Sequence, residues 1–463
     1  MLDAWHLTGF DEPDDGWLEG HTASGEKFRA PALTGTEAAR VAAAVREAAL
    51  ESRSSRSTAD VIGSVASAAS RICGEGPEGV AARELLRMEL GWDERLIAET
   101  LAGMAATWSS DALAGIVEAE LGGLEALDGF TADLSWTGRG QRYRRALGPP
   151  IILQVLAGSV PGVAITATIR ALLVRSGVLC KLPEAEPGLL PLFARVLADE
   201  DPLLGRGVAA TWWPGASFPA AWREWIHRAG KTVVYGGGPT VEAVRAATPA
   251  DTEVVVYGPR TGVAVILPDG PATAAAALAR DICAYDQQGC VSPRLVYVVG
   301  ERWAGFVDDL ASELSAWTGD HPPPVPSAEE AVAIRAARAA FEFGGYEHGR
   351  TGVEAPGEKL TWTVLHSEDP AAHSENLPRV AWVHPVSDLT ALEDLLRPLE
   401  GRIQSFGYSG SEGLPELAGA ASRLAASRVA PLGTMAWPPA DWRHEGRHQL
   451  LPLINWTDLE ITE

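Results

Sequence analysis

Thr232-Val233-Val234-Tyr235-Gly236-Gly237-Gly238-Pro239-Thr240-Val241 combines a short apolar strand, a triple glycine and a proline that opens a helix. Glycines let backbone N–H groups approach a pyrophosphate, and the dipole of a helix N-terminus favours the anion. The stretch departs from the GxGxxG fingerprint, because Val241 occupies the place of the third glycine. A tight turn without a ligand therefore explains it equally well. In either case it predicts a strand–turn–helix unit.

Similar units stand on both sides of this stretch. After Gly148-Pro149-Pro150, short apolar runs alternate with amphipathic ones. We expect strands at 151–157, 178–182, 207–212, 232–235 and 253–257, and helices at 163–176, 187–198, 218–229 and 239–247. Such alternation predicts a mostly parallel sheet with helices on both faces, which binds ligands at the carboxyl ends of its strands.

The residues before this unit have a different pattern. Residues 1–34 are punctuated by glycines and predict a hairpin or an arm. Residues 36–124 are rich in alanine and have a helical period, broken at Gly74-Glu75-Gly76-Pro77 and near Trp108. The chain therefore begins with a helical lead-in.

A second α/β unit begins near Gly262, with a helix over 272–285 and a strand over 295–299. The run His321-Pro322-Pro323-Pro324-Val325-Pro326 fits either a stiff connector or an ordinary surface loop. The fold class is therefore α/β with more than one domain.

Composition and charge exclude several classes of protein. The chain has 463 residues, 46% of them hydrophobic, and a formal net charge of −23 that would repel nucleic acid. No run approaches the roughly 20 apolar residues of a membrane span. Four irregularly spaced cysteines suit neither a disulfide framework nor a zinc site, and the acidic N-terminal stretch is unlike a signal peptide. We expect reduced thiols and a cytoplasmic protein that binds no nucleic acid.

Cys290 stands in Asp286-Gln287-Gln288-Gly289-Cys290-Val291-Ser292-Pro293-Arg294, between the expected helix and strand. A thiol at a glycine-marked turn of this kind is accessible to an electrophilic carbonyl, which suits a nucleophile. Most free cysteines are instead small buried hydrophobes, so the residue alone leaves both roles open. Cys283 is expected to pack on the core face of its helix, and Cys180 is expected to point to the sheet face opposite to that of Lys181.

Two further polar residues follow strands of the first unit. Lys181 is one of only four lysines among 38 basic residues, and at a strand end it fits hydroxyl or phosphate binding as well as plain solvation. Ser159, in Ala157-Gly158-Ser159-Val160-Pro161-Gly162, either stabilises an oxyanion or caps the next helix.

The histidines are the remaining candidates for a metal site. His366, His373, His384 and His444 match no zinc spacing. We expect them at the surface or at an interface, and we expect no metal.

The order of Ser159, Lys181, Gly237 and Cys290 resembles that of the aldehyde dehydrogenase superfamily, in particular its acyl-CoA reductases of the LuxC type. The Ser159 loop and Gln288-Gly289-Cys290-Val291-Ser292-Pro293 carry part of this resemblance. A C-terminal block carries the rest, with Pro431-Leu432-Gly433-Thr434-Met435, Pro438-Pro439, Trp442-Arg443-His444-Glu445-Gly446-Arg447 and Asn455-Trp456-Thr457-Asp458-Leu459-Glu460.

The resemblance implies an aldehyde dehydrogenase-like fold and a role for each candidate residue. Cys290 would accept the acyl group, Lys181 and Glu184 would touch the adenosine ribose, and Ser159 would occupy the place of an oxyanion-binding Asn. Gly236, Gly237 and Gly238 would lie under the pyrophosphate. The implied parts are an N-terminal arm and helical region (1–130), a Rossmann-type nicotinamide-cofactor domain (131–261), a catalytic domain (262–430) and a C-terminal segment (431–463) that returns to the cofactor domain or an oligomer interface.

Two departures from the superfamily pattern bear on the reaction. Ser159 reaches less far than Asn, and loss of one oxyanion donor lowers a rate by roughly 10²- to 10³-fold. Hydrolytic aldehyde dehydrogenases carry a water-activating Glu where this chain has Val256-Tyr257-Gly258-Pro259-Arg260. Without that base, an acyl-enzyme persists long enough for thiol exchange or hydride attack.

The resemblance therefore implies an NADPH-dependent reductase that converts an acyl-CoA or an acyl-carrier-protein thioester to an aldehyde, through an S-acyl cysteine. NADH remains an alternative cofactor, and an acyl-activating synthetase is an expected partner. A homo-oligomer is expected, with the segment 451–461 pairing against a partner sheet. Three alternatives stay open: an acyl-phosphate reductase of the same superfamily, an aldehyde-oxidising dehydrogenase and a catalytically impaired scaffold.

Overall fold

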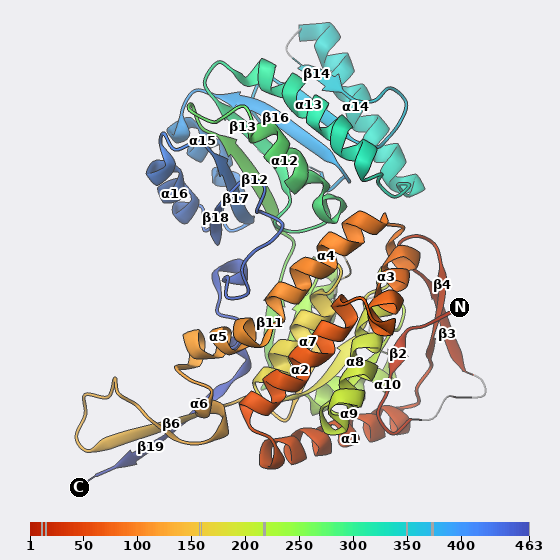
Figure 1. Ribbon diagram of the computed structural model, residues 1–463, viewed down its shortest axis with the longest axis vertical. Helices are drawn as coiled ribbons and strands as arrows, with labels where there is room; N and C mark the ends of the chain where they lie inside the picture. Colours follow the sequence, from red (N-terminus) through yellow and green to blue (C-terminus); the bar gives the residue numbers. More distant parts are fainter. Residues whose placement is uncertain are drawn as a thin grey trace. The chain divides into compact units, whose positions relative to one another are not determined.

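The strand–turn–helix unit quoted above is present in the computed structural model, where β10 (Lys231–Tyr235) ends at the glycine turn and α11 (Gly238–Ala247) follows. The structure describes residues 1–10, 13, 16–156, 158, 160–215, 219–348, 351–371 and 375–462. They belong to two units, drawn with their elements in Figure 1. The first unit contains Met1–Gly91, Ile97–Gly258 and His448–Glu463, and the second contains Trp92–Leu96 and Pro259–Arg447.

Within the described residues, the main sheet of the first unit has six strands in the order β11-β10-β7-β8-β9-β2. Besides β10, these are β11 (Glu253–Tyr257), β7 (Ile151–Val155), β8 (Gly177–Lys181), β9 (Val208–Thr211) and β2 (Trp5–His6). All neighbours are parallel except β2 and β9. Every residue of β7 and β10 is buried, as a parallel sheet covered on both faces requires. The predicted parallel sheet is confirmed.

The order of the strands locates a ligand-binding edge. From β7 the chain continues to β8 on one side and later reaches β10 on the other, so the order reverses between β7 and β10. Open α/β sheets bind ligands at the carboxyl ends of strands at such a reversal. The segment that contains Ser159 follows β7, and the glycine turn follows β10.

Helices cover both faces of this sheet and form the lead-in. The helices of the first unit are α1 (Gly35–Ser55), α2 (Thr58–Cys73), α3 (Pro77–Leu90), α4 (Glu94–Thr107), α5 (Ser110–Leu121), α6 (Glu125–Asp128), α7 (Val163–Leu173), α8 (Leu189–Glu200), α9 (Pro202–Arg206), α10 (Ala220–Arg228) and α11, with the first turn of α4 in the second unit. Thr34 and Ser57 begin α1 and α2 with capping boxes. The predicted breaks at 74–77 and near Trp108 are confirmed, because α2 and α4 end there.

The second unit contains a seven-stranded sheet in the described residues, in the order β14-β15-β16-β13-β12-β17-β18. Its strands are β14 (Thr351–Glu354), β15 (Thr363–Ser367), β16 (Val380–Val386), β13 (Pro293–Val299), β12 (Thr261–Ile266), β17 (Ile403–Ser409) and β18 (Arg428–Pro431), all parallel to their neighbours except β14. Its helices are α12 (Ala274–Cys283), α13 (Trp303–Asp320), α14 (Ala328–His348), α15 (Leu389–Leu396) and α16 (Leu414–Arg423), with the short 3₁₀ turns η1 (Ala284–Gln287), η2 (Arg397–Leu399) and η3 (His444–Gly446). The proline-rich run at 321–326 joins α13 to α14 inside this unit.

Two smaller sheets complete the first unit. β1 (Leu2–Asp3) and β3 (Trp17–His21) flank β4 (Lys27–Pro31), which confirms the hairpin expected near the N-terminus. β6 (Gln141–Leu147) pairs with β5 (Thr131–Ala132) and, antiparallel, with the C-terminal β19 (Asn455–Ile461). The β6–β19 pair forms the arm that ends at the C-terminus in Figure 1.

The C-terminal segment is fastened to the first sheet through a buried lysine. The Lys231 ammonium pairs with Glu253 at 2.7 Å and donates to the carbonyl oxygens of Pro452 and Ile454, in and after η4 (Leu451–Leu453). The bounds of the two units differ from those of the four ranges expected from the sequence. The roles given to those ranges stay predictions. None of the helices in the described part of the chain combines the length and hydropathy of a membrane span.

Candidate functional site

The turn that carries Cys290 begins with three strained residues. After α12, Tyr285, Asp286 and Gln287 have φ of 53°, 51° and 60°. The left-handed conformation costs a non-glycine residue about 1–2 kcal/mol. Backbone strain of this kind persists where the surrounding contacts fix it, and it clusters at functional sites. At these residues the chain leaves the helical conformation of α12, and Cys290 follows in the turn before β13.

Buried polar contacts hold this turn in place. Asp286 pairs with Arg379 at 2.8 Å, and burial raises the pKa of Asp286 while Arg379 lowers it. The Gln287 amide donates to Pro293 O at 2.7 Å and to Val380 O at 2.9 Å, and its oxygen accepts from Val380 N at 2.7 Å. Gln287 thus joins the turn to β16 as well as to β13. The sequence drew attention to 286–294, but nothing in it indicated Arg379.

Four charged or titratable groups surround the half-buried Cys290 thiol in the described residues: Arg294 from β13, Arg260 from the segment after β11, and His444 and Glu445 from η3. Burial and the nearby Glu445 charge raise the pKa of Cys290 to about 11, against the effect of both arginines and of its own N–H. Burial raises the pKa of Cys73, Cys180 and Cys283 further, to about 12.

His444 contacts the thiol directly. Its Nε2 lies 3.7 Å from the Cys290 sulfur. The ring packs on Trp442, with centroids 5.0 Å apart. The next residue, Glu445, has a left-handed φ of 55° and pairs with Arg260 at 3.4 Å.

The expected surface or interface position of the histidines is wrong for His384. His444 lies against the thiol, and His384 is buried with its Nδ1 3.1 Å from Ser367 O. His373 lies outside the described residues. The unusual C-terminal block signalled that its residues matter, but not that His444 meets Cys290.

The first unit holds the other sequence-predicted residues. Lys181 ends β8 beside Val155 of β7, with its ammonium 5.3 Å from the centre of the Trp213 ring. Burial lowers the pKa of Lys181 to about 8, and the exposed Glu184 partly opposes this. Ser159 lies outside the described residues.

The glycine turn fits the approach of a phosphate group. A Cβ added at Gly237 or Gly238 would meet no other atom within 4 Å, whereas one at Gly236 would meet Thr240 at 3.2 Å. Gly237 is the N-cap of α11, and no side chain caps that helix. The first N–H groups of α11 are thus accessible to an anion.

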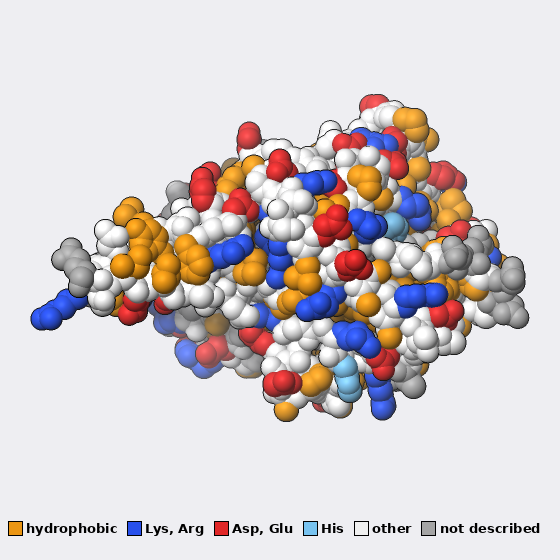
Figure 2. All heavy atoms as spheres, turned by 90° about the horizontal axis from the view of Figure 1, so that it is seen from below, with side chains coloured by type: hydrophobic (Ala, Val, Ile, Leu, Met, Phe, Trp, Pro, Cys, Tyr) orange, Lys and Arg blue, Asp and Glu red, His pale blue; other side chains and the backbone are white. Residues whose placement is uncertain are grey.

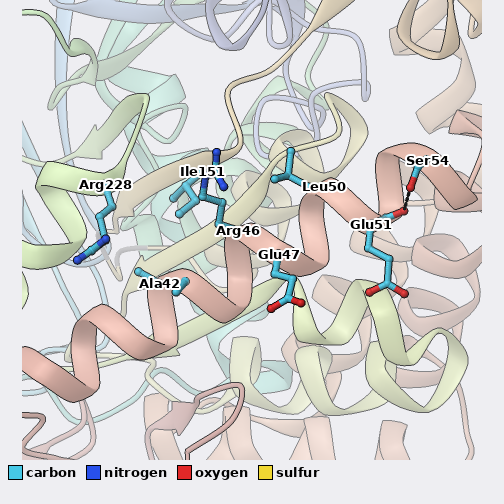
Figure 3. Close-up of a pocket in the computed structure, with 9 residues that line it drawn as sticks. Ala42, Arg46, Glu47, Leu50, Glu51, Ser54, Ile151 and Arg228 are labelled. Atoms are coloured by element: carbon cyan, nitrogen blue, oxygen red, sulfur yellow. Dashed lines mark hydrogen bonds between the residues drawn. The ribbon is translucent and has the colours of Figure 1, made fainter.

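Two hollows in the described structure lie apart from these residues. One of about 910 Å³ is lined by α1, by Ile151 at the start of β7 and by Arg228 at the end of α10. Figure 3 shows its mixed charge, with Arg46, Glu47 and Glu51 on one helix. The other, of about 580 Å³, lies between α12, α13 and residues 432–434. Neither is lined by Cys290 or by the glycine turn.

Solved aldehyde dehydrogenases have the same fold. A lactaldehyde dehydrogenase matches with a TM-score of 0.75 and 15% identity over 100% of both chains. A salicylaldehyde dehydrogenase from Pseudomonas putida G7 matches with a TM-score of 0.77 and 14% identity, over 100% of this chain and 99% of the other. A betaine aldehyde dehydrogenase from Staphylococcus aureus, solved with NAD⁺, matches with a TM-score of 0.77 and 13% identity, over 99% and 97%. The expected aldehyde dehydrogenase-like fold is confirmed.

Curated relatives are similar in sequence. The long-chain acyl-protein thioester reductase of Aliivibrio fischeri is 26% identical over 311 residues, which are 66% of this chain and 60% of the relative. The enzyme of the same name from Photobacterium phosphoreum is 26% identical over 314 residues, which are 67% and 59%. The match therefore spans about three fifths of each relative.

The family described as acyl-CoA reductase (LuxC) matches residues 54–456, a range that includes Lys181, the glycine turn, Cys290 and His444. The expected resemblance is confirmed over most of the chain, and the chain belongs to the acyl-CoA reductase (LuxC) family.

Proposed function

We propose that this chain reduces an acyl thioester to an aldehyde with NADPH, through an S-acyl intermediate on Cys290. Membership in the acyl-CoA reductase family supports the reaction type. The relatives named long-chain acyl-protein thioester reductase support a long acyl chain carried on a protein, and the family description supports CoA as the alternative carrier.

The observation that carries the proposal is the setting of Cys290. Of the four cysteines, all in the described residues, Cys180 and Cys283 are buried in the core. Cys290 lies at the end of a strained turn with Arg260 and Arg294 near its sulfur. Cations beside a thiol favour the thiolate, which is the nucleophilic form. The two arginines oppose the rise in the pKa of Cys290 that burial and Glu445 cause, and charged groups beside a sulfur that follows a strained turn are unneeded for a packing residue.

The first unit suits a nicotinamide dinucleotide. The uncapped start of α11 and the accessible Gly237 and Gly238 fit a pyrophosphate, and the Lys181 ammonium at the end of β8 fits a ribose hydroxyl. Glu184 is a second candidate for the ribose. A bound reduced nicotinamide supplies the hydride that brings the acyl carbon to the aldehyde level.

The protein's own part in the reaction begins with attack of the Cys290 thiolate on the thioester carbonyl. The carbon–sulfur bond to CoA or to a carrier protein breaks, and the acyl group remains on Cys290. The backbone N–H of Cys290 lowers the pKa of its own thiol, and it is the proposed first donor to the oxygen that becomes negative after hydride addition. Ser159 is the proposed second donor.

Reduction requires that water does not remove the acyl group first. The segment Val256-Tyr257-Gly258-Pro259-Arg260 has no carboxylate, but the fold brings Glu445 near the thiol, which the sequence did not indicate. Arg260 engages that carboxylate at 3.4 Å. An ion-paired carboxylate is a poor activator of water, so the acyl-enzyme is expected to survive until hydride transfer.

The proposed partners follow from the same reaction. An acyl-activating synthetase would supply the thioester, and a second copy of the chain would complete a homo-oligomer. The acidic charge of −23 gives no reason to propose nucleic acid as a partner.

Mass spectrometry of the intact protein tests the acyl-enzyme. Incubation with a long-chain acyl-CoA, without a cofactor, should add the mass of one acyl group, and peptide mapping should place it on Cys290. Addition of NADPH should discharge the adduct as free aldehyde.

Cys283→Ala and Cys180→Ala are the matched controls, because both thiols are buried in the core. Both should keep the adduct and the turnover, whereas Cys290→Ala should lose both. An adduct on Cys283 or Cys180, or full turnover in Cys290→Ala, contradicts the proposal.

A further inference from the structure

The Cys290 thiol has an unfavourable setting for a nucleophile at neutral pH. With its pKa raised to about 11, only roughly one thiol in ten thousand would be ionised near pH 7. Two arginines close to the sulfur do not overcome its burial and the charge of Glu445. Efficient acylation then requires a base that takes the proton as the sulfur attacks.

The structure places one basic side chain in hydrogen-bond contact with this sulfur among the described residues. His444 Nε2 lies 3.7 Å from Cys290 Sγ, although 154 residues separate the two in the sequence. The ring packs on Trp442, and the neighbouring Glu445 is held by Arg260 in a left-handed conformation. The His444 imidazole therefore lies between the Trp442 ring and the thiol, and the residue that follows it is held by an ion pair.

We infer that His444 is the proton-transfer partner of Cys290, as base for attack on the thioester and as acid for the departing thiol. The inference rests on the proposed function for its substrate, but the contact itself involves only residues of the second unit. A neutral imidazole must present a bare Nε2 to the thiol, which requires the hydrogen on Nδ1.

With Cys290 and His444 as the pair, every proton moved in the reaction has a donor and an acceptor. Nε2 takes the proton of the Cys290 thiol, the sulfur bonds to the carbonyl carbon, and the bond from that carbon to the departing sulfur breaks. The departing thiolate takes the proton from the imidazolium, so acylation consumes no proton. After hydride addition the carbon–sulfur bond to Cys290 breaks, the aldehyde leaves, and one solvent proton restores the thiol.

Alkylation of Cys290 by iodoacetamide tests the pair without substrate or cofactor. The full chain is treated from about pH 6 to about pH 10, and the rate at Cys290 is measured by peptide mapping. A coupled thiol and imidazole should give a parent profile with substantial reactivity near neutral pH. His444→Gln should lower the rate near pH 7 by about tenfold or more and leave a single rise at high pH. His444→Asn should behave alike.

His448→Gln is the matched control, because His448 lies four residues away in the first unit, with its Nδ1 3.8 Å from Glu120. It should keep the parent profile. Acylation by a long-chain acyl-CoA should also slow by about 100-fold in His444→Gln, within the usual range for a lost acid–base group.

The two proposals fail in different ways. If no thioester acylates the parent protein, the proposed function fails while the alkylation profile still reports on the pair. If His444→Gln alkylates and acylates like the parent, the role of His444 is overturned while the proposed function stands. If the substitutions unfold the chain, the parent profile decides: a single ionisation above about pH 9 overturns the pair.

Discussion

The Lys181 ammonium keeps its charge at a place where burial opposes it. Its pKa is lowered to about 8, with burial as the main cause and Glu184 as a partial compensation. A strand-end cation that loses solvation is better explained by a ligand that needs it than by solubility. The aromatic face of Trp213, 5.3 Å away, offers a further weak attraction to the cation.

The lowered pKa of Lys181 leads to a prediction of how cofactor binding depends on pH. Lys181 is charged below its pKa of about 8 and neutral above it, so NADPH affinity should fall as the pH rises through about 8. Lys181→Ala should weaken binding by about tenfold near pH 7, the loss of one charge-assisted hydrogen bond, and should remove this pH dependence. Fluorescence titration with NADPH at two pH values measures both effects.

Lys27→Ala is the control for this prediction, because Lys27 is an exposed lysine of β4. It should leave the affinity and its pH dependence unchanged. A cofactor affinity in Lys181→Ala equal to that of the parent would remove Lys181 from the site.

At the scale of elements, α12 fastens the C-terminal block that carries His444. The buried Asp281 of α12 accepts from Gly433 N at 2.6 Å and from Met435 N at 3.0 Å. Burial raises the pKa of Asp281 to about 6, although the N–H donors oppose this. These two hydrogen bonds attach the segment between β18 and η3 to α12. The same helix precedes the turn that carries Cys290.

Asp281→Ala should therefore destabilise the chain by about 1–3 kcal/mol, because it removes the acceptor of the buried Met435 N–H and of the part-buried Gly433 N–H. The folded pKa of about 6 lies above the usual 3.8, so the folded state binds the proton more tightly. The stability that Asp281 contributes should then be larger at about pH 5 than at about pH 7, and it should decline as the pH rises through about 6.

Urea unfolding at both pH values measures this difference, with Asp309→Ala on the exposed side of α13 as control. A difference from the parent that is equal at both pH values would contradict the raised pKa of Asp281.

Local patterns predicted most of the elements, because strands and helices of the first unit are short, regular and bounded by glycine or proline. β10, α11 and β11 form within one residue of the expected bounds. The missed features depend on distant contacts. The β6–β19 pair joins residues more than 300 positions apart, and the Cys290–His444 contact spans 154.

In the candidate site, too, local sequence indicated some features and distant contacts determine the others. Glycine and flanking elements indicated the Cys290 turn, but the left-handed run at 285–287 contains no glycine and is imposed by Arg379 and by β16. Such strain follows from tertiary contacts and leaves no trace in local sequence. The predicted roles of Lys181, Glu184, Gly236, Gly237 and Gly238 depend on a cofactor and stay predictions.

At the scale of the whole molecule, the β6–β19 arm presents apolar side chains to solvent. Every residue of β19 is exposed, including Leu459 at 44% and Ile461 at 48%. Figure 2 shows hydrophobic side chains gathered on the arm at the left of that view. An exposed strand with apolar side chains and an unpaired edge is suited to pair with another chain. This supports the expected homo-oligomer.

Leu459 and Ile461 lie two residues apart and thus on the same face of β19. Replacing both with Asp should therefore cost the isolated chain little, but it should place two desolvated carboxylates in any interface formed by that face. We expect the double variant to have a smaller assembly mass by light scattering after size exclusion, with an unchanged circular dichroism spectrum. Val332→Asp, at an exposed valine of α14, should keep the parent mass. If the double variant also keeps it, the arm is not the oligomer interface, because burial of two unpaired charges costs several kcal/mol.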